Sequence, residues 1–114
     1  MKLYIILSQS KRQLIAKEDV PALTPQHREY HNPMREKDAI LLQAMMRPDE
    51  MTPKGSRCMI LQAETREEVD DFIQRNPLMA HDAMEWTVHE LLPNYAATSV
   101  QEWFQGKFSK GHGQ

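Results

Sequence analysis

Cysteine is almost absent from this chain of 114 residues, in which Cys58 is the single example. One cysteine cannot form an internal disulfide, and such usage favours a reducing, cytoplasmic setting. No hydrophobic run approaches the roughly 20 residues that span a bilayer, and residues 3–7 are too few for the core of a signal peptide. Basic charge is not in excess, because the formal net charge is −2. We therefore expect a cytoplasmic protein with neither a membrane nor a nucleic acid as partner.

Glycine is also scarce, with four residues in all. The chain has no glycine-rich phosphate loop, no dinucleotide fingerprint and no nucleophile elbow of the G-x-S-x-G type. No cofactor is expected. What the chain does contain is an ordinary share of hydrophobic residues, 40%, and of charged residues, 26%. These values indicate one globular domain with a modest core.

Hydrophobic patterning predicts four strands and a first helix in the N-terminal 93 residues. The predicted strands are residues 2–8, 39–46, 57–63 and 84–89. The first helix begins at Thr24-Pro25, where threonine is the N-cap and proline takes the first helical position. Asn32-Pro33 should kink or divide this helix, because proline lacks a backbone donor and clashes with the preceding turn.

A second helix is predicted between the third and fourth strands. It begins at a capping box, in which Thr65 accepts from the backbone of Glu68 and the Glu68 carboxylate reaches back. Its next turns place Val69, Phe72 and Ile73 on one face, so this helix should cover the sheet. It should end near Asn76, because the residue before a proline avoids the helical region.

The order of these elements, βαββαβ, is that of a ferredoxin-like α+β fold, a four-stranded antiparallel sheet with helices on one face. The first strand is apolar on both faces, which indicates that the second sheet face is buried as well. Large exposed apolar patches are rare on monomers, so we expect a homodimer that packs sheet against sheet. Residues 1–93 form the expected domain. Residues 94–114 are a C-terminal extension with a short helix at about 99–104 and a flexible end.

Three segments resemble the YciI-like family, also called YCII-related domains: Leu3-Tyr4-Ile5-Ile6, residues 24–30 (TPQHREY) and residues 76–93 (NPLMAHDAMEWTVHELLP). The resemblance covers about residues 1–93 and implies a small dimeric α+β barrel. It also implies that a histidine near the start of the first helix, here His27, pairs with the aspartate of an Asp-Pro motif as a catalytic dyad. This chain departs from the pattern. It has Asn76-Pro77 at the second position, and Ala44-Met45-Met46 where relatives often carry Ala-Gly-Pro.

His27 is the predicted catalytic residue. At helical spacing it shares one face with Tyr30, His31 and Met34, and that face should point at the sheet. A histidine in this place is able to act as a general acid or base near neutral pH. The alternative is a core histidine that only hydrogen-bonds a backbone group.

Asn76 is the second predicted catalytic residue. An aspartate there would fix the tautomer of the imidazole and raise its basicity, whereas asparagine orients the ring without supplying charge. Either Asp82 or Glu85 replaces the missing acid, or the chain no longer catalyses the reaction. Asn76 also has a purely structural interpretation, as the residue that ends a helix before a proline.

A metal site and a reactive cysteine were weighed against these residues. His27 and His31 have the i, i+4 spacing of two ligands to a shared metal, and His81, Asp82 and His89 are candidates for further ligands, but two ligands fall short of the usual three or four. No metal is therefore expected. Cys58 is predicted to be a small buried hydrophobe.

Two functions remain open. The first is cofactor-independent acid/base chemistry, of the isomerase or lyase type, on a small organic molecule, with Tyr30, His31, Met45 and Asp82 contacting the substrate. The second is a non-catalytic small-molecule-binding or assembly module that has lost the His-Asp dyad. A cofactor-free oxygenase is a third class, because folds of this kind support several chemistries.

Overall fold

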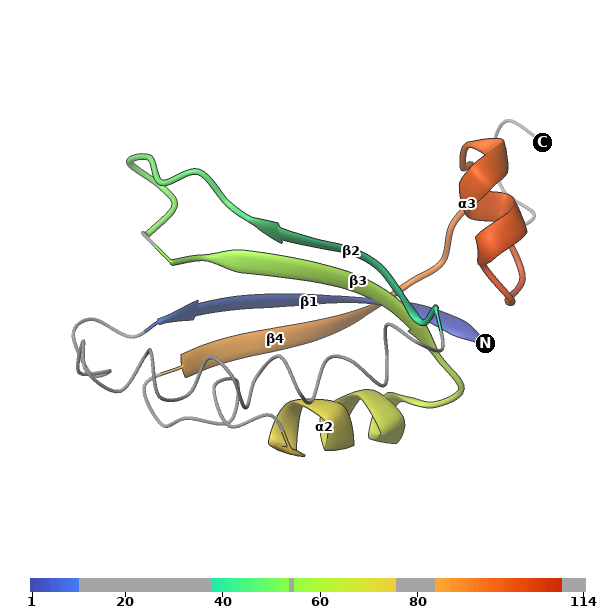
Figure 1. The fold of residues 1–114 in the computed structure, drawn as a ribbon, viewed down its shortest axis with the longest axis horizontal. Coiled ribbons are helices and arrows are strands. Elements are labelled where there is room, and N and C mark those ends of the chain that lie inside the picture. The colour runs from blue at the N-terminus through green and yellow to red at the C-terminus, as the bar shows by residue number, and fades with distance from the viewer. Residues whose placement is uncertain (11–37, 54, 76–83, 110–114) are drawn as a thin grey trace.

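The centre of the molecule is a four-stranded antiparallel sheet with the strand order β2-β3-β1-β4 (Figure 1). The computed structural model describes residues 1–10, 38–53, 55–75 and 84–109. Its strands are β1 (Lys2–Ser10), β2 (Ile40–Met45), β3 (Arg57–Ala63) and β4 (Met84–Leu91). They lie within a few residues of the predicted runs, and the ferredoxin-like α+β fold class is confirmed. The predicted first helix falls in residues 11–37, outside the described part of the chain.

Helix α2 (Arg66–Arg75) covers one face of this sheet (Figure 1). Its first turn is capped as the sequence predicts: the Glu68 N–H donates to Thr65 Oγ1 at 3.2 Å. The Glu68 carboxylate accepts from the N–H of Glu64 at 3.0 Å, one residue before the cap. The two bonds satisfy backbone donors that the helix itself leaves unpaired.

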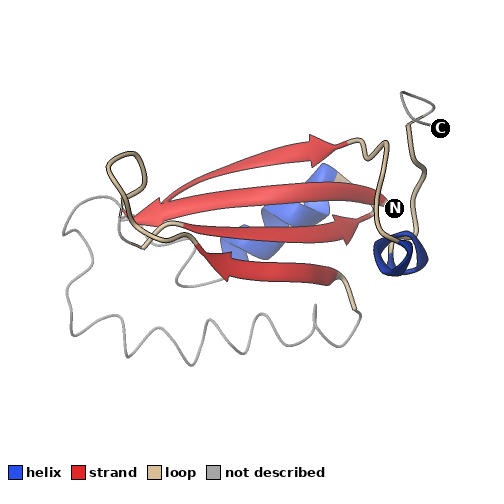
Figure 2. Ribbon diagram, turned by 90° about the horizontal axis from the view of Figure 1, so that it is seen from above, coloured by secondary structure: helices blue, strands red, loops and turns tan. Residues whose placement is uncertain are grey.

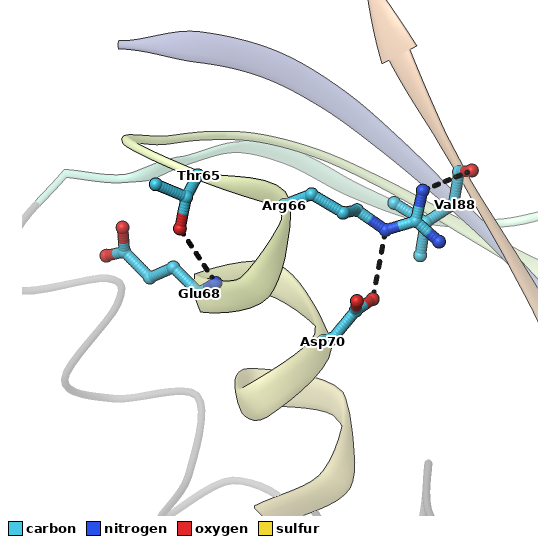
Figure 3. A network of polar contacts seen from close by, with 5 residues as sticks. All are labelled: Thr65, Arg66, Glu68, Asp70 and Val88. Carbon is cyan, nitrogen blue, oxygen red and sulfur yellow. Dashed lines mark hydrogen bonds and ion pairs between the residues drawn. The ribbon is translucent and has the colours of Figure 1, made fainter.

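Arg66 links the start of α2 to the sheet (Figure 3). Its Nε donates to Asp70 Oδ1 at 3.0 Å, one turn further along the helix, and its Nη1 lies 3.5 Å from the carbonyl oxygen of Val88 on β4. The ion pair is largely exposed. Such pairs contribute little to stability, so Arg66 serves mainly to orient the helix against β4.

The hydrophobic core lies between α2 and the sheet. The helix contributes Val69, Phe72 and Ile73, the three residues predicted to share its inner face. The strands contribute alternate residues, because successive side chains of a strand point to opposite faces. The buried sheet residues of this core are Tyr4, Ile6, Ala39, Met59, Leu61, Ala63 and Val88.

The other sheet face is apolar at its centre and only partly covered. Ile5 and Ile60 pair across β1 and β3, and both are half-buried, while Leu42 on the edge strand remains 48% exposed. Figure 2 looks onto this face, with α2 behind it, the β2–β3 hairpin at one end and helix α3 (Thr98–Trp103) at the other. We call this surface the open face.

The C-terminal segment covers one end of the open face. There Leu3 and Gln62, which are register partners on β1 and β3, are both buried. Gln62 bonds to the end of α3, and the Trp103 indole N–H donates to the carbonyl oxygen of Asp38 at 2.6 Å. Phe104 is buried after the helix.

The same arrangement packs Gly106 closely against the first residue of the chain. A Cβ on Gly106 would meet both the carbonyl oxygen of Met1 and the ring of Phe104. Phe104 also makes an edge contact with Phe108, with ring centroids 5.9 Å apart. In the part of the chain that the structure describes, no helix is long and apolar enough to cross a membrane.

Candidate functional site

Most of the predicted site residues fall outside the described residues. His27, Tyr30 and His31 lie in 11–37, and Asn76 and Asp82 lie in 76–83. Their roles therefore stay predictions.

Met45 is the predicted site residue that the structure does describe. It ends β2, the edge strand, where it pairs with Arg57 of β3, and its side chain is 73% exposed. Because this side chain is so exposed, a contact with substrate would need a further surface over the edge strand. The contact of Met45 with the substrate therefore stays a prediction.

Two further candidates on β4 lie on the open face. Glu85 accepts a hydrogen bond from Gln9 Nε2 at 3.0 Å, and His89 pairs in register with Ile5. Both are exposed. Val88 lies between these two residues in the sequence, and its side chain points to the opposite face of the sheet, into the core beneath α2. A carboxylate on the open face is separated by the sheet from groups on the α2 face, so Glu85 is poorly placed to assist a base on that side.

Metal-binding clusters are absent from the described residues: no three histidine, cysteine, aspartate or glutamate side chains there are grouped to hold an ion. Cys58 is half-buried on β3, next to Ala44 of the edge strand, rather than fully buried as predicted. It is on the opposite sheet face from its buried neighbour Met59.

Tyr4 is a functional candidate that the sequence did not single out as such. It is 1% exposed, on the α2 face of β1, and its hydroxyl has no hydrogen-bond partner among the described residues. Burial raises the pKa of the Tyr4 phenol above its ordinary value, and the carboxylates of Glu90 and Glu67 raise it further. The hydroxyl therefore stays protonated and is a potential donor.

An unpartnered hydroxyl in this place calls for an explanation, since buried polar groups are nearly always hydrogen-bonded. Leaving such a group unsatisfied costs about 1–3 kcal/mol. Tyr4 lies beside α2, where a ligand oxygen bound between sheet and helices would supply the missing acceptor. In the sequence this tyrosine looked like one more apolar strand residue, and burial of its ring gave no hint of a lone hydroxyl.

A pocket of about 460 Å³ lies at the end of the sheet that carries the β2–β3 hairpin, between this hairpin and the paired strands β1 and β4. We call it the hairpin pocket. Its lining residues in the described chain are Leu7, Ser8, Gln9, Met46, Met51, Thr52, Pro53, Ser56, Glu85, Trp86 and Thr87. The hairpin wall is held in shape by Asp49, whose Oδ1 accepts from the N–H groups of Met51 and Thr52, each at 2.8 Å. The sequence showed this segment only as a polar loop.

Comparison with known proteins supports the fold. No family model matches the chain, and a search of curated proteins found no significant match. Eight solved chains match by structure. One is the 5-chloro-2-hydroxyhydroquinone dehydrochlorinase TftG of Burkholderia phenoliruptrix AC1100, in complex with 2,5-dihydroxybenzoquinone. Its sequence is 18% identical to this chain, and the two structures superpose with a TM-score of 0.59. The match covers 80% of this chain and 94% of the dehydrochlorinase.

Proposed function

We propose that this protein is a YciI-like enzyme that performs cofactor-independent acid/base chemistry, of the isomerase or lyase type, on a small organic molecule. The observation that carries the proposal is the buried Tyr4 hydroxyl on the α2 face of the sheet, which has no hydrogen-bond partner among the described residues. A ligand with an oxygen acceptor beside Tyr4 would satisfy that hydroxyl, which stays protonated because its pKa is raised. The structurally similar dehydrochlorinase supports a reaction of the elimination class on this fold.

The proposed mechanism gives each predicted residue one role. His27 takes a proton from carbon, and the electron pair left behind forms a double bond as the leaving group departs or as the proton returns elsewhere. Asn76 orients the imidazole. Tyr4 donates a hydrogen bond to the substrate oxygen on which negative charge develops, the kind of stabilisation that usually contributes most to catalysis.

The substrate would be held by Tyr30, His31, Met45 and Asp82. We further propose a homodimer that packs the open face of one copy against that of another. The half-exposed apolar centre of that face, around Ile60 and Leu42, supports this assembly, because a second sheet would remove it from water. Such a dimer would work in the cytoplasm.

The test is a screen of small hydroxylated aromatic and carbonyl compounds for thermal stabilisation of the protein, followed by turnover assays of the hits. Wild type is compared with His27→Ala and Tyr4→Phe. We expect the hit to be lost or weakened in both variants, and turnover to fall by about 10²–10⁴-fold in His27→Ala. Hits that bind both variants as tightly as wild type would refute the proposed site.

A second candidate function is a non-catalytic binding or assembly module, which Asn76 favours because it carries no charge. Asn76→Asp separates the two functions. If the scaffold retains its proton-transfer chemistry, restoring the carboxylate raises turnover by at least tenfold, since the aspartate increases the basicity of the imidazole. Ligand binding without turnover in both wild type and Asn76→Asp indicates a binding module.

A further inference from the structure

The hairpin pocket has the size and lining of a small-molecule site. Its volume of about 460 Å³ lies within the ~300–1,000 Å³ that is typical of ligand pockets. Apolar side chains of Leu7 on β1 and of Met46 and Met51 on the hairpin contribute to the walls, and Trp86 of β4, whose side chain packs against the core, also borders the pocket. Methionines adapt their shape to irregular ligands and suit an apolar or aromatic body.

Among the described residues that line the pocket, the charge is of one sign. Glu85 is the charged side chain among its described lining residues. The described charged residues of the hairpin, Arg47, Asp49 and Glu50, do not line it. Among the described residues Glu85 forms no ion pair, so its charge is not neutralised there by a lysine or arginine.

Gln9 fixes the position of this carboxylate. Its amide donates to Glu85 Oε2 at 3.0 Å from the neighbouring strand, where the two residues are register partners. A neutral donor orients a carboxylate but leaves its negative charge in place. The Oε1 atom then remains for a ligand, and Thr87, which also lines the pocket, adds a hydroxyl oxygen two residues along the same face.

We propose that the hairpin pocket binds a small organic cation, a primary amine on an aromatic or aliphatic body, with Glu85 as its counter-charge. An ammonium group offers three donors and no acceptor, which matches a carboxylate and hydroxyl oxygens. An anionic ligand of the same shape would be repelled. This site lies at the end of the sheet and uses none of His27, Asn76 and Tyr4, so it is independent of the proposed reaction.

Three matched probes test the proposal: 2-phenylethylamine, the neutral 2-phenylethanol and the anionic 3-phenylpropanoate. They are titrated into the full-length protein and followed by ¹H–¹⁵N NMR. We expect the amine to bind about two- to fivefold more tightly than the alcohol, the advantage of a partly exposed charge pair. The acid should bind most weakly. The backbone amide signals of Glu85 and Thr87 should move, and the indole N–H signal of Trp103, which donates to Asp38, should not.

Two variants assign the effect to Glu85. Glu85→Gln should abolish the advantage of the amine over the alcohol. Glu90→Gln removes the same charge from the same strand on the opposite face, and should leave it unchanged. His27→Ala should also bind the amine normally, which separates this site from the proposed active site. Equal binding of the three probes, an unchanged preference in Glu85→Gln, or loss of binding when the protein self-associates would each overturn the proposal.

Discussion

Gln62 of β3 donates from Nε2 to the carbonyl oxygen of Trp103 at 3.1 Å, across 41 residues of sequence. Its Oε1 accepts from the N–H of Gln105 at 2.8 Å. One side chain, 5% exposed, therefore satisfies two backbone groups at the end of α3. Backbone groups at a helix end need such partners once water is excluded, so the C-terminal segment is attached to the sheet through this glutamine.

Replacing Gln62 with alanine should lower the free energy of unfolding by about 1–3 kcal/mol, because two partly buried backbone groups lose their partner. Urea denaturation measures the change. The control is Gln101→Ala, which removes an exposed bond to the carbonyl oxygen of Ala96 and should change stability by less than about 0.5 kcal/mol. Equal effects of the two variants would contradict the role assigned to Gln62.

Tyr4→Phe should leave stability near neutral pH unchanged or raise it slightly, because it removes a hydroxyl that has no partner among the described residues. The same change should weaken binding of the proposed substrate. A variant that gains stability but loses ligand binding would indicate that the Tyr4 hydroxyl serves binding and not folding. A loss of stability of 2 kcal/mol or more would instead indicate that the hydroxyl is paired in the folded protein.

The alkaline limb of the stability curve gives a separate test of Tyr4. Its pKa is raised in the folded protein by burial and by the carboxylates of Glu90 and Glu67. As the pH rises past about 10, tyrosine in the unfolded chain ionises first, so this residue draws the equilibrium towards unfolding. Urea unfolding at pH 9 and pH 11 should show a smaller loss for Tyr4→Phe than for wild type. Tyr95→Phe, at an exposed tyrosine, should behave as wild type does.

Asp49 should determine the order of the hairpin wall. Hydrogen bonds from the N–H of Met51 and from Thr52 lower the pKa of its carboxyl below 3.8. The stability that these hydrogen bonds contribute to the folded hairpin is therefore present above pH 3.8, and it is lost as the pH falls through the lower pKa of Asp49 in the folded protein. In Asp49→Ala the amides of Met51 and Thr52 should exchange with solvent faster at neutral pH, and the acid-dependent change in their NMR shifts should disappear. Glu50→Ala is the control, and similar behaviour of both variants would exclude this role.

Association through the open face should depend on its exposed centre. Leu42→Lys places a charge beside Ile60 and should shift the protein from dimer towards monomer, by at least tenfold in dissociation constant. Analytical ultracentrifugation measures the shift. Leu92→Lys changes another exposed leucine, outside the sheet, and should leave association unaffected. A wild-type protein that is monomeric at high micromolar concentration would refute the dimer.

Local signals account for the part of the fold that sequence could predict. The capping box at Thr65 and the spacing of Val69, Phe72 and Ile73 fix the start and the inner face of α2. The alternation of apolar and polar residues predicts β4, and the run of apolar residues near the N-terminus predicts β1. The antiparallel pairing of β2 with β3 then follows from the hairpin that joins them, whereas β1 pairs with β3 and β4 across longer connections.

The site was less accessible because it depends on contacts between distant segments. The bond from Gln9 to Glu85 and the bond from Gln62 to Trp103 each join residues that no periodic pattern links. No pattern in the sequence shows either that the Tyr4 hydroxyl lacks a partner among the described residues. The walls of the hairpin pocket likewise come from three separate segments. Polar loops carry almost no signal of the concave surface that they form once folded.

Gly106 lies where a side chain would collide with the carbonyl of Met1, so anything fused in front of the first residue emerges directly against the last described turns. An N-terminal purification tag would push on those turns and, through Phe104, on the aromatic contacts beneath them.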